Sequence, residues 1–342
     1  MSKKSRILFI YWPFTSFIQN DLELLRKYFE VKPLQLRGKN LRGLFWFTLR
    51  IFKDILQTDV TFSWFADLHA AIAVLFSKIF HKKSIVVVAG YDVAKIPELN
   101  YGLALNPIVA PIVKFTIEKA DKVLVVDAAL KKDAMKNIGA NGNNIQILPT
   151  GFDHRKFKPE GEKENLVITV STGDNWRRVQ LKGLDTFVKS AKFLSEVKFL
   201  IIGIQKEALK KLKTIAPSNV EFINQIPQDR LISYYQKAKV YCQLSLREGL
   251  PTALCEAMLC ECVPVGTFVQ GVKTVITNDV GFFVPYGDHE ATVKAIKKAS
   301  NSLGKGKFAR ERIKNLFPIE NREKELVRII HSLCLPNSNK LG

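Results

Sequence analysis

Short apolar, β-branched segments alternate with helix-length segments along nearly the whole chain, and this alternation constrains the fold more than any other feature. The strand candidates of the first half are Arg6–Tyr11, Asp59–Ser63, Ser84–Val88, Lys122–Val126 and Ile145–Leu148. Those of the second half are Leu166–Ser171, Lys198–Ile202, Val220–Ile223, Val240–Leu244, Val263–Gly266 and Gly281–Val284. The helix-length segments between them include Asp185–Ser195, Gln205–Ile215, Gln228–Ala238 and His289–Ser300. The pattern predicts an α/β fold in which a parallel sheet covered by helices on both faces occurs twice.

A polar segment, Phe157–Asn165, separates the two series, and its Pro and Gly among charged residues are typical of an interdomain linker. A chain of 342 residues is long enough for two domains with separate cores. We expect an N-terminal domain over residues 1–160 and a C-terminal domain over residues 161–305. Residues 306–342 are predicted to form helices that pack back toward the N-terminal domain.

The strongly basic composition predicts an anionic partner or substrate, because 52 basic residues against 32 acidic ones give a net charge of +20. Eight of the basic residues lie between Arg26 and Lys53, and Leu41–Lys53 combines Phe and Trp with Arg and Lys at helical spacing. Residues 38–53 could therefore lie on an anionic membrane surface. The alternative is a core helix with a solvated basic face, and periodicity does not separate the two. No recognition motif accompanies the charge, so nucleic acid is not an expected partner.

Cysteine usage and hydropathy predict a cytoplasmic protein, which the basic aromatic segment could place at the inner face of the membrane as a peripheral protein. The five cysteines (242, 255, 260, 262 and 334) are odd in number and lack paired spacing, which indicates reduced thiols and no zinc site. No apolar run approaches the roughly 18 residues of a membrane span. The N-terminus passes directly into a strand-like run, so we expect no signal peptide.

Two carboxylates separated by seven residues, Glu248 and Glu256, mark the segment with the most chemical content. The segment lies between two apolar runs and therefore at the carboxyl end of a predicted strand, where such folds bind ligands. Pro251 suits the first position of a helix, and Gly249 allows close approach of a ligand to the backbone. The free N–H groups of a first helical turn would bind a diphosphate, and the carboxylates would bind sugar hydroxyls. The alternative is a surface loop before an ordinary helix with solvated Glu side chains.

Several segments in the same order resemble the retaining family-4 glycosyltransferases of the GT-B fold (glycosyl transferases group 1). They are Ala120–Val126, Ile147–Asp153, Phe157–Pro159, Lys182–Phe187, Glu248–Glu256, Val263–Gly266, Gly271–Ile276 and Gly281–Asp288. The resemblance covers about residues 120–300. It implies two Rossmann-like domains facing a central cleft, with the acceptor on the N-terminal side and a nucleotide diphosphate sugar on the C-terminal side. The implied reaction is transfer of a hexosyl group, with retention, to a glycan or lipid-linked acceptor, as in polysaccharide biosynthesis. No cofactor and no metal are implied, and the sequence contains no D-x-D pair.

The resemblance also assigns roles to residues. Lys182 would hold the donor diphosphate and stabilise the leaving nucleotide, Glu248 would hold hydroxyls of the transferred sugar, and Glu256 would accept hydrogen bonds from the ribose. The predicted donor-binding residues are Arg177, Arg178, Lys182, Gly249, Leu250, Pro251, Thr252 and Glu256. The loop Ile223–Pro227 lies where family members contact the base, largely through backbone.

The first hundred residues depart from the family pattern. The loop Tyr11–Asn20 lacks the glycines that many relatives carry, and Asp92 stands where relatives often have a histidine. Asp92 is a catalytic candidate at the end of a strand, or else a helix N-cap. Two other functions fit the sequence: a nucleotide-sugar epimerase or glycogen-type glucosyl enzyme on the same fold, and a basic, non-catalytic module that binds anionic glycans or nucleic acid.

Overall fold

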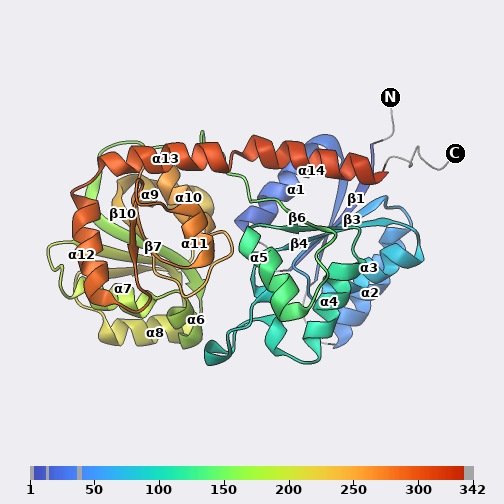
Figure 1. The fold of residues 1–342 in the computed structure, drawn as a ribbon, viewed down its shortest axis with the longest axis horizontal. Coiled ribbons are helices and arrows are strands. Elements are labelled where there is room, and N and C mark those ends of the chain that lie inside the picture. Colours follow the sequence, from blue (N-terminus) through green and yellow to red (C-terminus); the bar gives the residue numbers. More distant parts are fainter. Residues whose placement is uncertain (1–3, 13–14, 37–40, 335–342) are drawn as a thin grey trace. The chain divides into compact units, whose positions relative to one another are not determined.

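The computed structural model describes residues 4–12, 15–36 and 41–334, which form two compact α/β units (Figure 1). The first unit contains the described residues up to Thr150 and those from Glu320 onward, and the second contains Gly151–Ile319. Parts of three predictions lie outside the described residues: residues 38–40 of the basic segment, 13–14 of the glycine-free loop and 335–342 of the C-terminal segment. Among the described residues, no helix is both long enough and apolar enough to cross a bilayer.

The first unit is built on a six-stranded, all-parallel sheet of order β2-β1-β3-β4-β5-β6. Its strands are β1 (Arg6–Tyr11), β2 (Glu30–Gln35), β3 (Val60–Trp64), β4 (Lys83–Val88), β5 (Lys122–Val125) and β6 (Ile145–Ile147). Its α-helices are α1 (Ser16–Tyr28), α2 (Leu41–Ile55), α3 (Leu68–Ile79), α4 (Val109–Lys119), α5 (Ala128–Asp133) and α14 (Ile319–Cys334). The sequence predicted five of these strands and missed β2. That strand is polar and contains Pro33, which an edge strand tolerates because one side needs no ladder hydrogen bonds.

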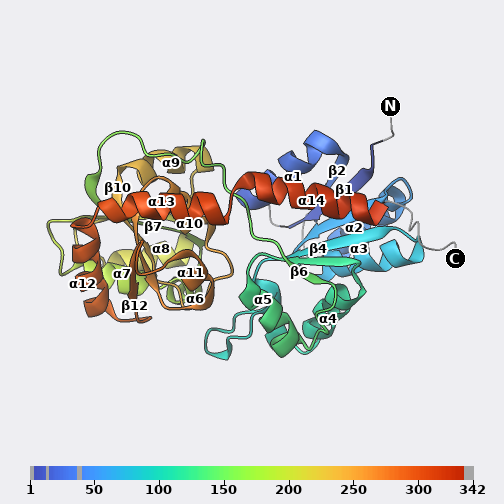
Figure 2. The same cartoon turned by 45° about the horizontal axis from the view of Figure 1, so that its top comes forward.

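The second unit is built on a separate parallel sheet of order β12-β11-β10-β7-β8-β9. Its strands are β7 (Glu164–Gly173), β8 (Lys198–Ile204), β9 (Val220–Ile223), β10 (Ala238–Gln243), β11 (Val263–Thr267) and β12 (Phe282–Val284). Its helices are α6 (Trp176–Leu181), α7 (Leu184–Ala191), α8 (Lys206–Ile215), α9 (Gln228–Lys237), α10 (Thr252–Leu259), α11 (Gln270–Val275), α12 (His289–Ser300) and α13 (Gly304–Leu316). Figure 2 shows the same elements from a second direction. The predicted fold class, two Rossmann-like parallel-sheet domains, is confirmed.

The sheet order of the second unit fixes where a ligand can bind. Strand β7 is followed along the chain by β8 on one side of it, and the chain later returns as β10 on the other side. The loops after β7 and β10 therefore leave the sheet in opposite directions. Crevices between such loops are the usual ligand sites of open parallel sheets.

The last two helices belong to different units. Helix α13 packs on α10 in the second unit, whereas α14 belongs to the first. Arg322 on α14 forms a buried, bidentate ion pair with Asp21 of α1, with both N–O distances at 2.6 Å. Its third nitrogen donates to the carbonyls of Leu148 and Pro149, each at 2.9 Å. This guanidinium therefore joins α14, α1 and the segment after β6.

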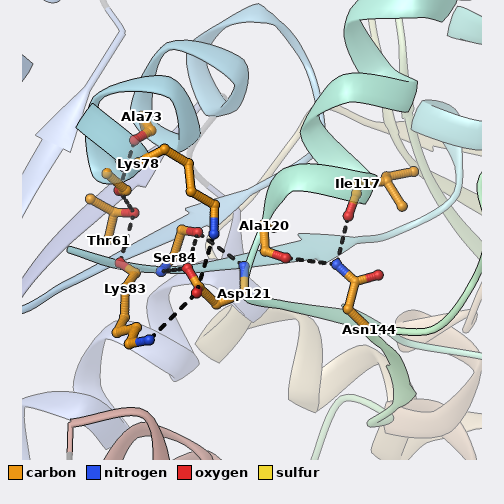
Figure 3. Close-up of polar contacts among 10 residues, drawn as sticks. Thr61, Ala73, Lys78, Lys83, Ser84, Ile117, Ala120, Asp121 and Asn144 are labelled. Atoms are coloured by element: carbon orange, nitrogen blue, oxygen red, sulfur yellow. Dashed lines mark hydrogen bonds and ion pairs between the residues drawn. The ribbon is translucent and has the colours of Figure 1, made fainter. Parts of the chain in front are cut away.

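A polar network at the amino-terminal edge of the first sheet ties neighbouring strands together (Figure 3). Oδ2 of Asp121, just before β5, accepts hydrogen bonds from the backbone N (3.0 Å) and hydroxyl (2.8 Å) of Ser84 in β4. Oδ1 of Asp121 accepts from Lys78 of α3 at 3.3 Å and lies 3.7 Å from the ammonium of Lys83. The network lies at the edge opposite to the carboxyl ends of the strands, so it stabilises the scaffold at the end where these folds do not usually bind ligands.

Candidate functional site

The carboxylate of Glu248 lies at the carboxyl edge of the second sheet, where one of its oxygens accepts three hydrogen bonds. Oε1 accepts from Lys182 Nζ at 2.5 Å, from Gln243 Nε2 at 2.8 Å and from the hydroxyl of Ser245 at 2.6 Å. Gln243 ends β10, and Ser245 lies just beyond it. The side chains of Lys182 and Glu248 are 14% and 10% exposed, so the pair is largely, but not fully, withdrawn from solvent. Two residues that the sequence singled out separately thus form one ion pair.

The electrostatics of this pair are set mainly by its burial. Desolvation lowers the pKa of Lys182, the attraction of Glu248 raises it, and the nearby guanidinium of Arg178 lowers it. The second carboxylate oxygen of Glu248 accepts none of the three hydrogen bonds above. The arrangement therefore offers a second cation, Arg178, near Lys182, and an acceptor oxygen suited to a hydroxyl group.

Two glycines allow the backbone to hold this pair. Gly183 directly follows Lys182 with φ +63°, and a Cβ there would lie 2.1 Å from the carbonyl oxygen of Leu244. A Cβ on Gly271, at the start of α11, would lie 1.9 Å from the carbonyl oxygen of Gly249. Only glycine fits at either position without moving the backbone. The turn that carries Lys182 is therefore held against the end of β10, and the loop that carries Glu248 against α11.

The second carboxylate of the motif, Glu256, is buried and directed toward α9. It is 5% exposed, and its two oxygens accept hydrogen bonds from Gln228 Nε2 at 2.6 Å and from the hydroxyl of Tyr235 at 3.2 Å. Burial raises its pKa to about 7, an effect that these hydrogen bonds and the charge of Lys156 oppose. The two carboxylates thus have different partners: Glu248 accepts from Lys182, and Glu256 accepts from residues of α9.

Helix α10 begins one residue later than the sequence predicts. Thr252 is its first residue, and Pro251 occupies the N-cap with φ −75° and ψ 91°, so placing Pro251 at the first helical position was wrong. Proline cannot cap with its side chain, and the structure shows no side-chain hydrogen bond at this N-terminus. No side-chain cap therefore occupies the amide groups that follow Pro251. They could still donate hydrogen bonds to an anion, so the anion site stays a prediction.

A pocket of about 380 Å³ opens at the carboxyl ends of β7 and β8. Its lining residues are Thr172, Gly173, Asp174, Asn175, Arg178, Gly203, Gln205, Lys206 and Gln225. Arg178 is held there by hydrogen bonds from its Nε to the Thr172 carbonyl and from its backbone N to Asn175 Oδ1, each at 3.0 Å. Of the predicted cations, Arg178 lines the pocket and Lys182 pairs with Glu248, whereas Arg177 is exposed on α6. The sequence did not predict three of the lining residues as site residues, although each closely follows an apolar strand run: Asp174, Gln205 and Lys206.

The carboxylate of Asp92 is held by backbone groups of the first unit. Its carboxylate is buried and accepts hydrogen bonds from the backbone N atoms of Ala66 and Ala89, each at 3.0 Å, and of Gly90 at 3.4 Å. Burial raises its pKa to about 6, and the backbone hydrogen bonds oppose that rise. It joins the segments after β3 and β4 and is not the predicted helix N-cap, because Gly90 holds that position for the short helix Tyr91–Val93. These contacts favour a structural role for Asp92, and its catalytic role stays a prediction.

Groupings that could hold a metal ion are absent from the described part of the chain: no three His, Cys, Asp or Glu side chains come together there. The second unit contains four of the cysteines, all buried. Burial raises the pKa of the Cys242 thiol, so it is a poor nucleophile and a poor metal ligand.

Solved structures with the same arrangement of strands and helices define the class of fold. Sucrose-phosphate synthase from Thermosynechococcus elongatus superposes with a TM-score of 0.81 at 16% identity, covering 96% of this chain and 99% of that one. Anabaena Alr3699/HepE, solved in complex with UDP and glucose, gives a TM-score of 0.77 at 14% identity, with 96% and 100% covered. These likenesses concern the fold. The chain has the GT-B architecture of two Rossmann-like units.

Sequence comparison narrows this class to a family. Residues 152–315, most of the second unit, match the model of the family Glycosyl transferases group 1. The capsular polysaccharide biosynthesis glycosyltransferase CapM of Staphylococcus aureus is 26% identical over 247 residues, 65% of this chain and 64% of the relative. An undecaprenol-linked glycan is named in a Campylobacter jejuni relative, "GalNAc-alpha-(1->4)-GalNAc-alpha-(1->3)-diNAcBac-PP-undecaprenol alpha-1,4-N-acetyl-D-galactosaminyltransferase", which is 30% identical over 199 residues, 54% of each chain. The matches thus span between about half and two thirds of these relatives.

Proposed function

We propose that this protein is a retaining glycosyltransferase that moves a hexosyl group from a nucleotide diphosphate sugar to a glycan or lipid-linked acceptor without a metal ion. The observation that carries the proposal is the Lys182–Glu248 pair at the carboxyl edge of a sheet whose unit belongs to a glycosyltransferase family. A paired ammonium and carboxylate at this edge suits a ligand that has both phosphates and hydroxyls.

The donor diphosphate would be held by positive charge from three sources. These are Lys182, Arg178 in the adjacent pocket and the uncapped amides of Thr252 and its neighbours in α10. When the bond between the anomeric carbon and the phosphate oxygen breaks, negative charge grows on the leaving nucleotide. Fixed cations that are partly withdrawn from water stabilise that charge strongly. Lys182 would therefore contribute more to turnover than to donor affinity.

The remaining residues would orient the donor. Glu248 would direct its second oxygen to hydroxyls of the transferred sugar, while Lys182, Gln243 and Ser245 fix the first oxygen. Glu256 would accept hydrogen bonds from the ribose once its carboxylate is ionised, and Gln225 would lie toward the base side of the pocket. Retention would follow if the leaving phosphate takes the proton of the acceptor hydroxyl on the face where the new bond forms.

The acceptor class rests on the relatives. Their names include a capsular polysaccharide enzyme, an undecaprenol-linked glycan enzyme and a phosphatidylinositol N-acetylglucosaminyltransferase subunit from Arabidopsis thaliana. A glycan or a lipid-linked saccharide is therefore the acceptor class that we propose here.

The first test is the thermal stability of the purified protein in chelator-treated buffer with UDP, GDP, ADP and their sugars. A ligand that binds only the folded state raises the melting temperature in proportion to the logarithm of its concentration. We expect one nucleotide to do so, and we expect Glu256→Ala to abolish the shift while the exposed control Glu290→Gln retains it. No shift with any of these ligands would overturn the donor site.

A second test separates the proposed transfer from the two other functions. We expect Lys182→Ala to lose turnover with little loss of nucleotide affinity, and the exposed control Lys189→Ala to keep both. An epimerase would convert its nucleotide sugar without any acceptor. A non-catalytic binding module would bind anionic glycans with steep salt dependence, whether or not Glu248 and Glu256 are intact. Either of these last results would exclude the transferase.

A further inference from the structure

A row of exposed apolar side chains runs along helix α2 of the first unit. Phe45, Leu49 and Phe52 follow each other at intervals of four and three residues, which places them on one side of the helix, and Leu56 follows just after its end. Phe45 is 59% exposed, and Trp46 beside it is 64% exposed, with their ring centroids 5.9 Å apart. A contiguous group of large exposed apolar side chains is typical of an interaction surface, whereas scattered ones need no explanation.

The core of the first unit does not need this row. A second series on α2, Phe47, Ile51 and Ile55, is buried. Phe47 and Ile51 pack in the cluster formed by residues of β1, β2 and α3. The helix thus has one apolar side that serves the fold and another that faces solvent. The exposed row calls for an explanation outside the unit.

Helix α3 widens the exposed row into a surface. The two helices lie side by side in both views (Figures 1 and 2), and the ring of Phe52 packs edge-on against Phe76 and Phe80 at 5.9 and 5.5 Å. Next to these rings, Leu75 and Ile79 of α3 are exposed and one helical turn apart. We call the exposed apolar residues of α2 and α3 the α2–α3 face.

The charges around this face are positive. Arg42, Arg50 and Lys53 are exposed along α2. The acidic residue of the helix, Asp54, is buried and paired with Lys32 at 2.7 Å, and Arg50 lies 4.0 Å from it. The α2–α3 face therefore combines exposed aromatic rings with exposed cations whose charge is not balanced by exposed acidic side chains on the same helix.

We propose that the α2–α3 face binds the surface of an anionic lipid bilayer. Aromatic rings enter the boundary between headgroups and acyl chains, and adjacent Arg and Lys side chains pair with lipid phosphates. A second copy of this chain fits less well, because each copy carries a net charge of +20. A lipid-linked acceptor would be presented at such a surface, but the inference does not depend on the transfer activity.

Flotation with vesicles tests the proposal. The full-length protein is mixed with vesicles of phosphatidylcholine alone or of equimolar phosphatidylcholine and phosphatidylglycerol, at low and high salt. We expect binding to the anionic vesicles, weakened by salt. Phe45→Ser with Trp46→Ser should reduce the partition coefficient by at least about tenfold, since two large side chains lose their burial in lipid. Arg42→Gln with Lys53→Gln should reduce it about thirtyfold on anionic vesicles.

Matched controls separate binding by this face from nonspecific binding through other exposed apolar residues and from the effect of the net charge. Ile108→Ser removes an even more exposed apolar residue of the first unit, and Lys297→Gln with Lys298→Gln removes two exposed charges of α12. Both controls should float as the natural protein does. A blue shift of tryptophan fluorescence on adding anionic vesicles should vanish in Trp46→Phe. Absence of anionic binding, equal loss in the controls, or a dimer that dissociates when Phe45 and Trp46 are replaced would overturn the proposal.

Discussion

Replacing Gly183 with alanine should disrupt the candidate donor site far more than it disrupts the fold. Gly183 has φ +63°, and an added Cβ would lie 2.1 Å from the Leu244 carbonyl oxygen, where ordinary contact begins at 3.4 Å. The left-handed backbone costs an alanine about 1–2 kcal/mol. The overlap adds a shift of about 1.3 Å between the Lys182 turn and the end of β10. A misplacement of about 1 Å can cost about a hundredfold in rate.

The matched control for this substitution is Gly161→Ala. Gly161 also has a positive φ, +70°, but an added Cβ there meets nothing within 4 Å. Both variants therefore carry the same backbone penalty, and only Gly183→Ala carries the displacement. Urea unfolding should show a loss of about 1–2 kcal/mol for the control and a larger loss for Gly183→Ala.

Nucleotide-dependent stabilisation and sugar transfer provide the functional readout. The control should retain both, whereas Gly183→Ala should lose transfer about a hundredfold, because Lys182 moves away from the scaffold that holds Glu248. Equal transfer rates in the two variants would refute the argument that this turn positions Lys182. Equal stabilities would refute the steric part of it.

Three further perturbations test other parts of the structure. Because burial raises the folded-state pKa of Glu256 from 4.5 to about 7, its contribution to stability should fall by about 3 kcal/mol as the pH rises through this range. Glu256→Gln should remove that fall when urea unfolding is compared at about pH 5 and about pH 8, and equal pH slopes would contradict it. Arg322→Met should destabilise the first unit by about 3–5 kcal/mol by leaving Asp21 buried and unpaired. Adding Asp21→Leu should restore most of the loss in the same unfolding assay, and additive losses would contradict this. Asp92→Asn should cost about 1–3 kcal/mol, since one backbone donor loses its acceptor, while nucleotide binding measured by calorimetry stays unchanged; loss of binding would return Asp92 to the site.

The buried strands could be predicted from the sequence because their apolar runs need no knowledge of neighbours. β1 (Arg6–Tyr11) and β9 (Val220–Ile223) have the predicted bounds, and most other predicted strands differ by one or two residues at their ends. β2 (Glu30–Gln35) is mostly exposed, with Leu34 as its one buried residue, and it contains a proline and a lysine, so its local sequence carries no strand signal. Its place at the edge of the sheet, which tolerates such residues, is a property of the whole fold.

The sequence predicted which residues of the candidate site carry charge, but not how they pair. Lys182 and Glu248 were singled out separately, and the ion pair between them depends on the order of strands β7 and β10 in the sheet. Gln243 lies within the predicted strand Val240–Leu244 and Ser245 directly follows it, and nothing in the local sequence shows that their side chains bind Glu248. The role of Asp92 stays open for a related reason, since its position at the end of a strand suits a ligand and a backbone bridge equally well.

Helix α2 shows why one periodic pattern admitted two interpretations. A helix that serves only a core has one apolar side, and a helix that serves only a membrane surface also has one. Here the series Phe47, Ile51 and Ile55 is buried, while the series Phe45, Leu49 and Phe52 is exposed, so both apolar sides occur on the same helix. Sequence periodicity reports the apolar residues of both sides together. It therefore cannot show which side packs on the core and which faces solvent. Burial assigns the first to the fold and leaves the second, with its flanking cations, for a partner that is both apolar and anionic.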